Sequence, residues 1–172
     1  MVDKIFELKI AHINGWLIGL VQLCYGINYV PHYNAMMFTP SSNEITTDIL
    51  KAISSRASDR LSERYECNDI ELIKSWEEYL SDSIDRWVFQ RILGARQNIT
   101  INSPIPNHLS YLHKNTANRL VWLIREAMTS MELDVWKFKI CHGYCFQYGF
   151  DNEAYAFKSV DRGLIMTFGW VD

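Results

Sequence analysis

The sequence predicts a single α+β domain in which helices and strands occupy separate parts of the chain. In the middle of the chain the apolar residues recur with a helical period, and in the last third short aromatic runs alternate with polar turns. The 172 residues contain no internal repeat and no linker flanked by a second complete core. We therefore expect one domain over residues 1–172.

Residues 5–23 are expected to form an N-terminal β-hairpin. Two apolar runs flank the dipeptide Asn14-Gly15, and both of these residues tolerate the positive φ angles of a tight hairpin turn. The alternative is one long apolar helix that Gly15 interrupts. The turn signal favours the hairpin.

About three helices are expected in the centre of the chain. The first spans residues 44–66, where isoleucines recur every four residues. The second spans residues 69–93 and ends before Gly94, a residue type that commonly follows a helix C-terminus. The third spans residues 116–132, with alanine, valine, isoleucine and methionine along one face.

The last third is expected to form a C-terminal antiparallel β-meander. Short aromatic and apolar runs are separated by polar turns of two or three residues, including Asp151-Asn152-Glu153 and Asp161-Arg162-Gly163. The expected strands are residues 135–140, 144–150, 155–160 and 164–171.

Composition and charge exclude several classes of function. The net charge is −3 and the pI is about 5.9, whereas a nucleic-acid-binding protein is usually basic. Residues 1–8 mix acidic and basic side chains, unlike a secretory signal, and no apolar stretch is long enough to span a bilayer. We expect a cytoplasmic protein with free thiols that binds neither nucleic acid nor membrane.

No motif for nucleophilic catalysis, phosphate binding, dinucleotide binding or metalloprotease chemistry occurs, so we expect a protein without enzymatic activity or cofactor. The pattern Cys141-His142-x-x-Cys145 suggests a metal site, but structural zinc normally takes four ligands, and the other two cysteines stand alone. We expect no metal there. The alternative function is a small cytoplasmic enzyme that pairs one of these cysteines with a distant histidine.

Charge is strongly segregated along the chain. Residues 66–85 contain seven acidic residues and one lysine, whereas residues 86–125 contain six basic residues and no acidic one. The helix dipole favours acids near a helix start and explains only part of this asymmetry. The rest predicts an acidic surface that meets a basic partner. The expected partner-binding residues are Glu71, Glu77, Glu78, Asp82 and Asp85.

The closing segment, residues 155–172, combines the Asp161-Arg162 turn, the apolar run from Leu164 to Phe168 and a terminal Gly-Trp-Val-Asp. It resembles the last hairpin of some bacterial immunity proteins, the antidotes of contact-dependent growth inhibition and related polymorphic toxin systems. The resemblance covers about a tenth of the chain. It implies a compact, non-catalytic protein that binds and neutralises one cognate toxin domain, often a nuclease. It assigns no functional residue.

Overall fold

The computed structural model describes residues 3–23, 30–41, 44–55, 65–90, 107–129, 132–142 and 151–171. These residues form four α-helices, one π-helical segment and five strands, so the predicted α+β class is confirmed. In chain order the elements are α1 (Lys4–Leu23), β1 (Val30–Phe38), α2 (Ile45–Ser54), β2 (Tyr65–Ile73), α3 (Trp76–Ile84), the π-helical η2 (Asp85–Gln90), α5 (Asn107–Met128), β3 (Asp134–His142), β4 (Asp151–Lys158) and β5 (Gly163–Val171).

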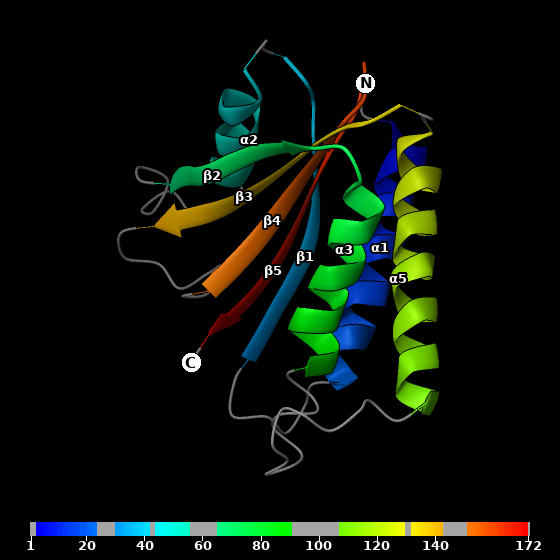
Figure 1. Ribbon diagram of the computed structural model, residues 1–172. Helices are drawn as coiled ribbons and strands as arrows, with labels where there is room; N and C mark the ends of the chain where they lie inside the picture. The colour runs from blue at the N-terminus through cyan, green and yellow to red at the C-terminus, as the bar shows by residue number, and fades with distance from the viewer. Residues whose placement is uncertain are drawn as a thin grey trace.

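The strands form one antiparallel sheet with the order β1-β5-β4-β3-β2 (Figure 1). Strands that follow one another in the chain, β3, β4 and β5, are neighbours in the sheet, so the predicted C-terminal meander is confirmed. The meander supplies the three central strands, and the two strands from the first half of the chain form the edges. The sheet edges are therefore β1 and β2.

Helices cover both faces of the sheet (Figure 1). Alternate residues of a strand point to opposite faces, and β5 follows this rule. Leu164 and Met166 pack with α1, α3 and α5 on one face, whereas Ile165 packs with Ile49 of α2 on the other. Two apolar clusters thus hold the layers together, the larger on the side of the three helices.

The predicted hairpin at residues 5–23 is wrong, because this segment forms the single helix α1. Asn14 does not make a turn. Its side-chain Nδ2 donates to the backbone oxygen of Ala35 at 2.8 Å, and the Ala35 N–H donates to Asn14 Oδ1 at 2.7 Å. The Asn14 amide therefore satisfies the outward-facing N–H and C=O of Ala35 on edge strand β1, as a neighbouring strand would.

The helical alternative prevails at α1 because its apolar residues share one buried face. Phe6, Ile10, Ile13 and Leu17 are spaced three or four residues apart, and all four are buried against the sheet. Gly15 lies on the exposed side of the helix, where an added Cβ would meet no atom within 4 Å. The glycine is thus not required by local packing.

Two of the predicted helices are too long, because strand β2 occupies residues that were expected to be helical. The helix expected over residues 44–66 ends at Ser54, and the one expected over residues 69–93 begins at Trp76. The intervening β2 contains a bulge, because one extra residue separates Asn68 from Glu71 relative to β3, and Asp69 there has a φ of 55°. The bulge breaks the two-residue alternation by which a strand is recognised.

Three further differences concern shorter segments. The third helix begins at Asn107 instead of about residue 116, and β1 was not predicted. The expected turn at residues 151–153 is wrong, because these residues begin β4. There the Asn152 side chain pairs with the backbone N–H and oxygen of Ile140. The predicted strand at residues 144–150 lies outside the described residues.

Gly15→Ala tests the helical assignment of α1. Alanine is favoured over glycine inside a helix, so we expect the free energy of unfolding to rise by about 0.5–1 kcal/mol. Gly19→Ala is the matched control, because Gly19 lies one turn further along α1 and also faces open space. Urea denaturation measures both changes. A loss of stability for Gly15→Ala alone would indicate a positive φ at residue 15 and contradict the helix.

Candidate functional site

The predicted acidic residues lie on three consecutive elements, the first of which is edge strand β2. Glu71 belongs to edge strand β2, Glu77, Glu78 and Asp82 belong to α3, and Asp85 begins η2. Because α3 begins three residues after the end of β2 and η2 follows α3 directly, consecutive elements present these side chains (Figure 1).

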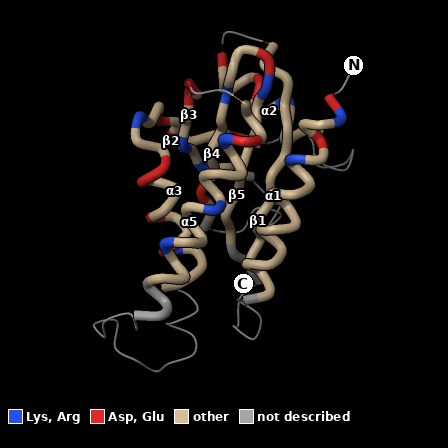
Figure 2. The backbone as a smooth tube through the Cα atoms, turned by 90° about the vertical axis from the view of Figure 1, so that its right-hand side faces the viewer, with Lys and Arg blue, Asp and Glu red and all other residues tan. Residues whose placement is uncertain are grey.

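Two of the five carboxylates bond to other parts of the chain. Glu77 is paired with Arg125 of α5, and Asp85 accepts a hydrogen bond from the Gln90 side chain. The acidic and basic segments of the sequence therefore fold into neighbouring helices, α3 and α5 (Figure 2). Part of the charge segregation serves the packing of one helix against the other.

The other three carboxylates are exposed, and no ion pair joins them to another described residue. Glu78 and Asp82 lie one turn apart on the outer side of α3. Glu71 lies opposite Lys137 of β3, whose ammonium is 5.6 Å from the centre of the Tyr79 ring on α3. We call Glu71, Glu78 and Asp82 the β2–α3 acidic surface.

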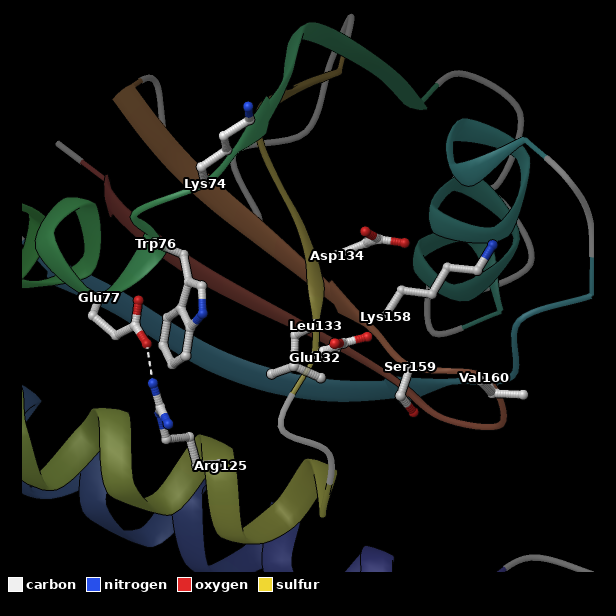
Figure 3. Close-up of a pocket in the computed structure, with 10 residues that line it drawn as sticks. All are labelled: Lys74, Trp76, Glu77, Arg125, Glu132, Leu133, Asp134, Lys158, Ser159 and Val160. Atoms are coloured by element: carbon white, nitrogen blue, oxygen red, sulfur yellow. Dashed lines mark hydrogen bonds and ion pairs between the residues drawn. The ribbon is translucent and has the colours of Figure 1, made fainter.

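A hollow of about 650 Å³ opens beside this surface (Figure 3). Its wall contains the Trp76 ring, which stands edge-on to Phe157 with ring centres 5.2 Å apart, and the Glu77–Arg125 ion pair. The charged residues that line it are Lys74, Arg125, Lys158, Glu77, Glu132 and Asp134. Because bases and acids are equal in number, the hollow is suited to a neutral or mixed side chain rather than a free ion.

The sequence did not point to the most polar cluster in the interior, which surrounds Glu153 of β4. Ser83 and Tyr155 both donate hydrogen bonds to Glu153 Oε1. Arg86 Nη1 lies 2.7 Å and Lys137 Nζ 3.6 Å from Oε2. These groups join α3, η2, β3 and β4 around one buried carboxylate.

The groups around Glu153 determine whether its carboxyl and the Tyr155 phenol are ionised. Burial alone would raise the pKa of Glu153, but the hydrogen bonds from Ser83 and Tyr155 and the charges of Lys137 and Arg86 bring it below its ordinary value. Burial, together with the adjacent carboxylate, raises the pKa of Tyr155. The phenol therefore stays protonated and donates. Ser83 and Tyr155 are fully buried, so their hydrogen bonds to Glu153 hold α3 on the sheet.

One signal in the sequence could have located this cluster. Glu153, Tyr155 and Phe157 alternate with the small residues Ala154 and Ala156. A period of two places the three large side chains on the same face of a strand. The carboxylate therefore shares a face with buried aromatic rings, and such a position requires partners for the charge.

Two of the four cysteines, Cys67 and Cys141, lie on β2 and β3, and Cys24 and Cys145 lie outside the described residues. Cys67 pairs in register with Ile140 on the α2 side of the sheet, so Cys141, the next residue along β3, faces the opposite side. Burial and the nearby Cys141 raise the pKa of Cys67 to about 12. Among the described residues, no three His, Cys, Asp or Glu side chains are grouped as metal ligands.

Within the described ranges, no helix is long and apolar enough to cross a membrane. Comparison of the chain with models of known protein families, with curated proteins and with solved structures found no match. The similarity of residues 155–172 to the closing hairpin of immunity proteins therefore stays a prediction.

Glu153→Gln is expected to lower the free energy of unfolding at pH 7 by roughly 1–3 kcal/mol, because it removes the charge that the cluster binds. Since folding depresses the pKa of Glu153, its contribution is present above the pKa of an unfolded carboxyl and lost as the pH falls through the folded value. The difference between wild type and variant should therefore shrink below about pH 4. Urea denaturation from pH 3 to 8 measures it, with Glu78→Gln as the exposed control. A difference independent of pH would contradict the charged cluster.

Cys67 is expected to react slowly with iodoacetamide. A rise in thiol pKa from 9.0 to about 12 leaves about 1,000-fold less thiolate at pH 8. Mass spectrometry of the labelled peptides, in native and urea-unfolded protein, compares the rates. Labelling of Cys67 as fast in the native protein as in urea would contradict this expectation and favour the Cys/His enzyme.

Proposed function

We propose that this chain is a non-catalytic binding protein whose β2–α3 acidic surface meets a basic region of another protein. The observation that carries the proposal is the set of three exposed carboxylates, Glu71, Glu78 and Asp82, that the described part of the fold leaves without an ion pair. Two elements that follow one another in the chain, β2 and α3, present them.

The helix start favours Glu78, in the first turn of α3, but α3 gains nothing of this kind from Asp82, which lies beyond that turn. Like charges one turn apart on a helix destabilise it by about 0.2–0.5 kcal/mol, and Glu78 and Asp82 are such a pair. An opposite charge on a partner would convert this repulsion into attraction and accelerate association. A binding role accounts for charges that the fold does not need.

The neighbouring hollow adds a place for an anchoring side chain. An interface usually combines a rim of charges with a few side chains inserted into pockets. The hollow beside Trp76 is adjacent to Glu77, which connects it to the charged surface along α3. A partner that binds the carboxylates can place an adjacent side chain there.

We further propose that the partner is a toxin domain, which the chain neutralises by covering a functional surface. The support for this is the resemblance of residues 155–172 to immunity proteins. Within that segment Leu164, Ile165, Met166 and Phe168 are fully buried in the centre of the sheet. The apolar residues that carry the resemblance thus belong to the core. Other residues have to contact the partner, and the β2–α3 acidic surface is our candidate.

The variant Glu71→Lys/Glu78→Lys/Asp82→Lys tests the surface. If the proposed toxin domain, which we expect an adjacent gene to encode, is the partner, association in low salt should slow at least tenfold, with a smaller change in dissociation. Stopped-flow or surface-plasmon measurements separate the two rates. The matched control is Asp161→Lys, which reverses a charge at the exposed β4–β5 turn. Equal association rates for the triple variant and wild type would contradict this surface.

Growth of bacteria that express the same toxic domain tests the neutralising role. Co-expression of the wild-type chain should restore growth, and the triple variant should restore it less well. Binding without rescue would retain the binding function and exclude neutralisation. Failure of the wild-type chain to bind that domain would exclude the toxin partner.

A further inference from the structure

The outer face of α1 presents large apolar side chains and few charges. Leu8 is 71% and Ile18 58% exposed, and both lie on the side of the helix opposite the buried Ile13. From Ile10 to Leu23 the helix contains no aspartate, glutamate, lysine or arginine (Figure 2). A surface helix normally has a charged outer face, whereas an apolar face is typical of one that is covered. The outer face of α1 therefore has the composition of an interface.

Small residues occupy the middle of this face. Ala11, Gly15 and Gly19 are exposed and four residues apart, so they follow one line along the helix. A Cβ added to Gly15 or Gly19 would meet no described atom within 4 Å. Glycine is less favourable than alanine inside a helix, and no contact in the described fold requires it here. The missing side chains leave room for the backbone of another helix to approach closely.

The exposed residues of this face are ordered symmetrically. Along the outer line of the helix they are Lys4, Leu8, Ala11, Gly15, Ile18 and Gln22. In a two-fold symmetric contact, residue i of one copy meets residue j of the other, and residue j meets residue i. If two copies of α1 cross antiparallel at the level of Ile13, Leu8 faces Ile18 and Ala11 faces Gly15. Small residues then meet at the crossing point, and large apolar side chains pack on either side of it.

The charges of α1 are compatible with the same pairing. Its charged residues are Lys4, Glu7 and Lys9, all within the first two turns. In an antiparallel pair they lie beside the uncharged last turns of the other copy, so like charges do not meet. The last turn of α1 contains no basic residue. Because Lys4 faces Gln22 of the other copy, it supplies the positive charge that a helix C-terminus favours.

We propose that the outer face of α1 binds the same face of a second copy of the chain, as an antiparallel helix pair. The face from Lys4 to Gln22 is about 27 Å long but only one helix wide, so it is smaller than a standard interface of about 800 Å² per partner. The dimer is therefore weak, and its population depends on protein concentration. The face shares no residue with the β2–α3 acidic surface, so the two proposals can fail independently.

Sedimentation velocity at increasing protein concentration measures the pairing. The wild-type chain should shift from a monomer of 20.2 kDa towards a dimer. Leu8→Lys should raise the dissociation constant of the dimer at least tenfold, because the symmetry places the lysine against an apolar side chain twice. Gly15→Leu should have a similar effect, because the added side chain keeps the two backbones apart.

The matched control is Leu72→Lys, the same substitution at a residue of β2 that is 56% exposed. It should leave the dissociation constant unchanged, and circular dichroism should show every variant folded. A wild-type chain that stays monomeric from dilute to concentrated solution would overturn the proposal. So would a dimer that Leu8→Lys leaves intact. Binding of a monomeric chain to phosphatidylcholine–phosphatidylglycerol vesicles, lost in Leu8→Lys, would also overturn it and assign the face to a lipid surface.

A pair of opposite charges tests the antiparallel geometry. Leu8→Lys and Ile18→Glu should each weaken the dimer, whereas the double variant should restore it in low salt. The lysine of each copy then faces the glutamate of the other. Within one copy the two side chains lie almost three turns apart, too far to pair. A double variant that pairs no better than the single variants would contradict this arrangement.

Discussion

The buried carboxylate of Glu153 is the interaction on which the arrangement of the helical layer depends. It receives hydrogen bonds from Ser83 of α3 and from Tyr155 of its own strand, and it lies beside the cations of Arg86 and Lys137. A buried carboxylate without partners would be strongly destabilising, and here each oxygen has partners from elements distant in sequence. The cluster therefore fixes α3 and η2 relative to β3 and β4. The apolar contacts around it, such as Trp76 against Phe157, then complete the packing.

The position of α3 determines what the chain presents to a partner. With Ser83 held toward the sheet, Glu78 and Asp82 face outward and Glu77 faces Arg125 of α5. One helix thus uses its charges in two ways, some within the fold and some on its surface. The same layer places basic residues on α5, the helix that packs beside α3 (Figure 2). Part of this segregation stabilises the contact between α3 and α5, and the proposed binding role accounts for the exposed remainder.

The sequence predicts correctly those helices and strands in which the spacing of apolar residues matches the buried face. The meander and the buried face of α5 are of this kind, and the segregated charges pointed to the exposed carboxylates of α3. Elements decided by distant contacts were not predicted. Asn14-Gly15 has a turn signature, yet the Asn14 amide bonds to Ala35, and that contact exists only once β1 lies beside α1. The bulge at Asp69 conceals the alternation of β2. Ser83, which donates to Glu153, lies 70 residues before it in the chain. Rules of helix and strand spacing predict contacts only between residues close in sequence.

The most direct test of the proposed binding role is hydrogen–deuterium exchange of the chain, free and in complex with the toxin domain that we propose as its partner. The account predicts that backbone amides of β2 and α3 around Glu71, Glu78 and Asp82 become more protected in the complex. Amides in the central strands β4 and β5, which are already buried, should change little. A complex in which protection appears elsewhere and leaves β2 and α3 unaffected would contradict it.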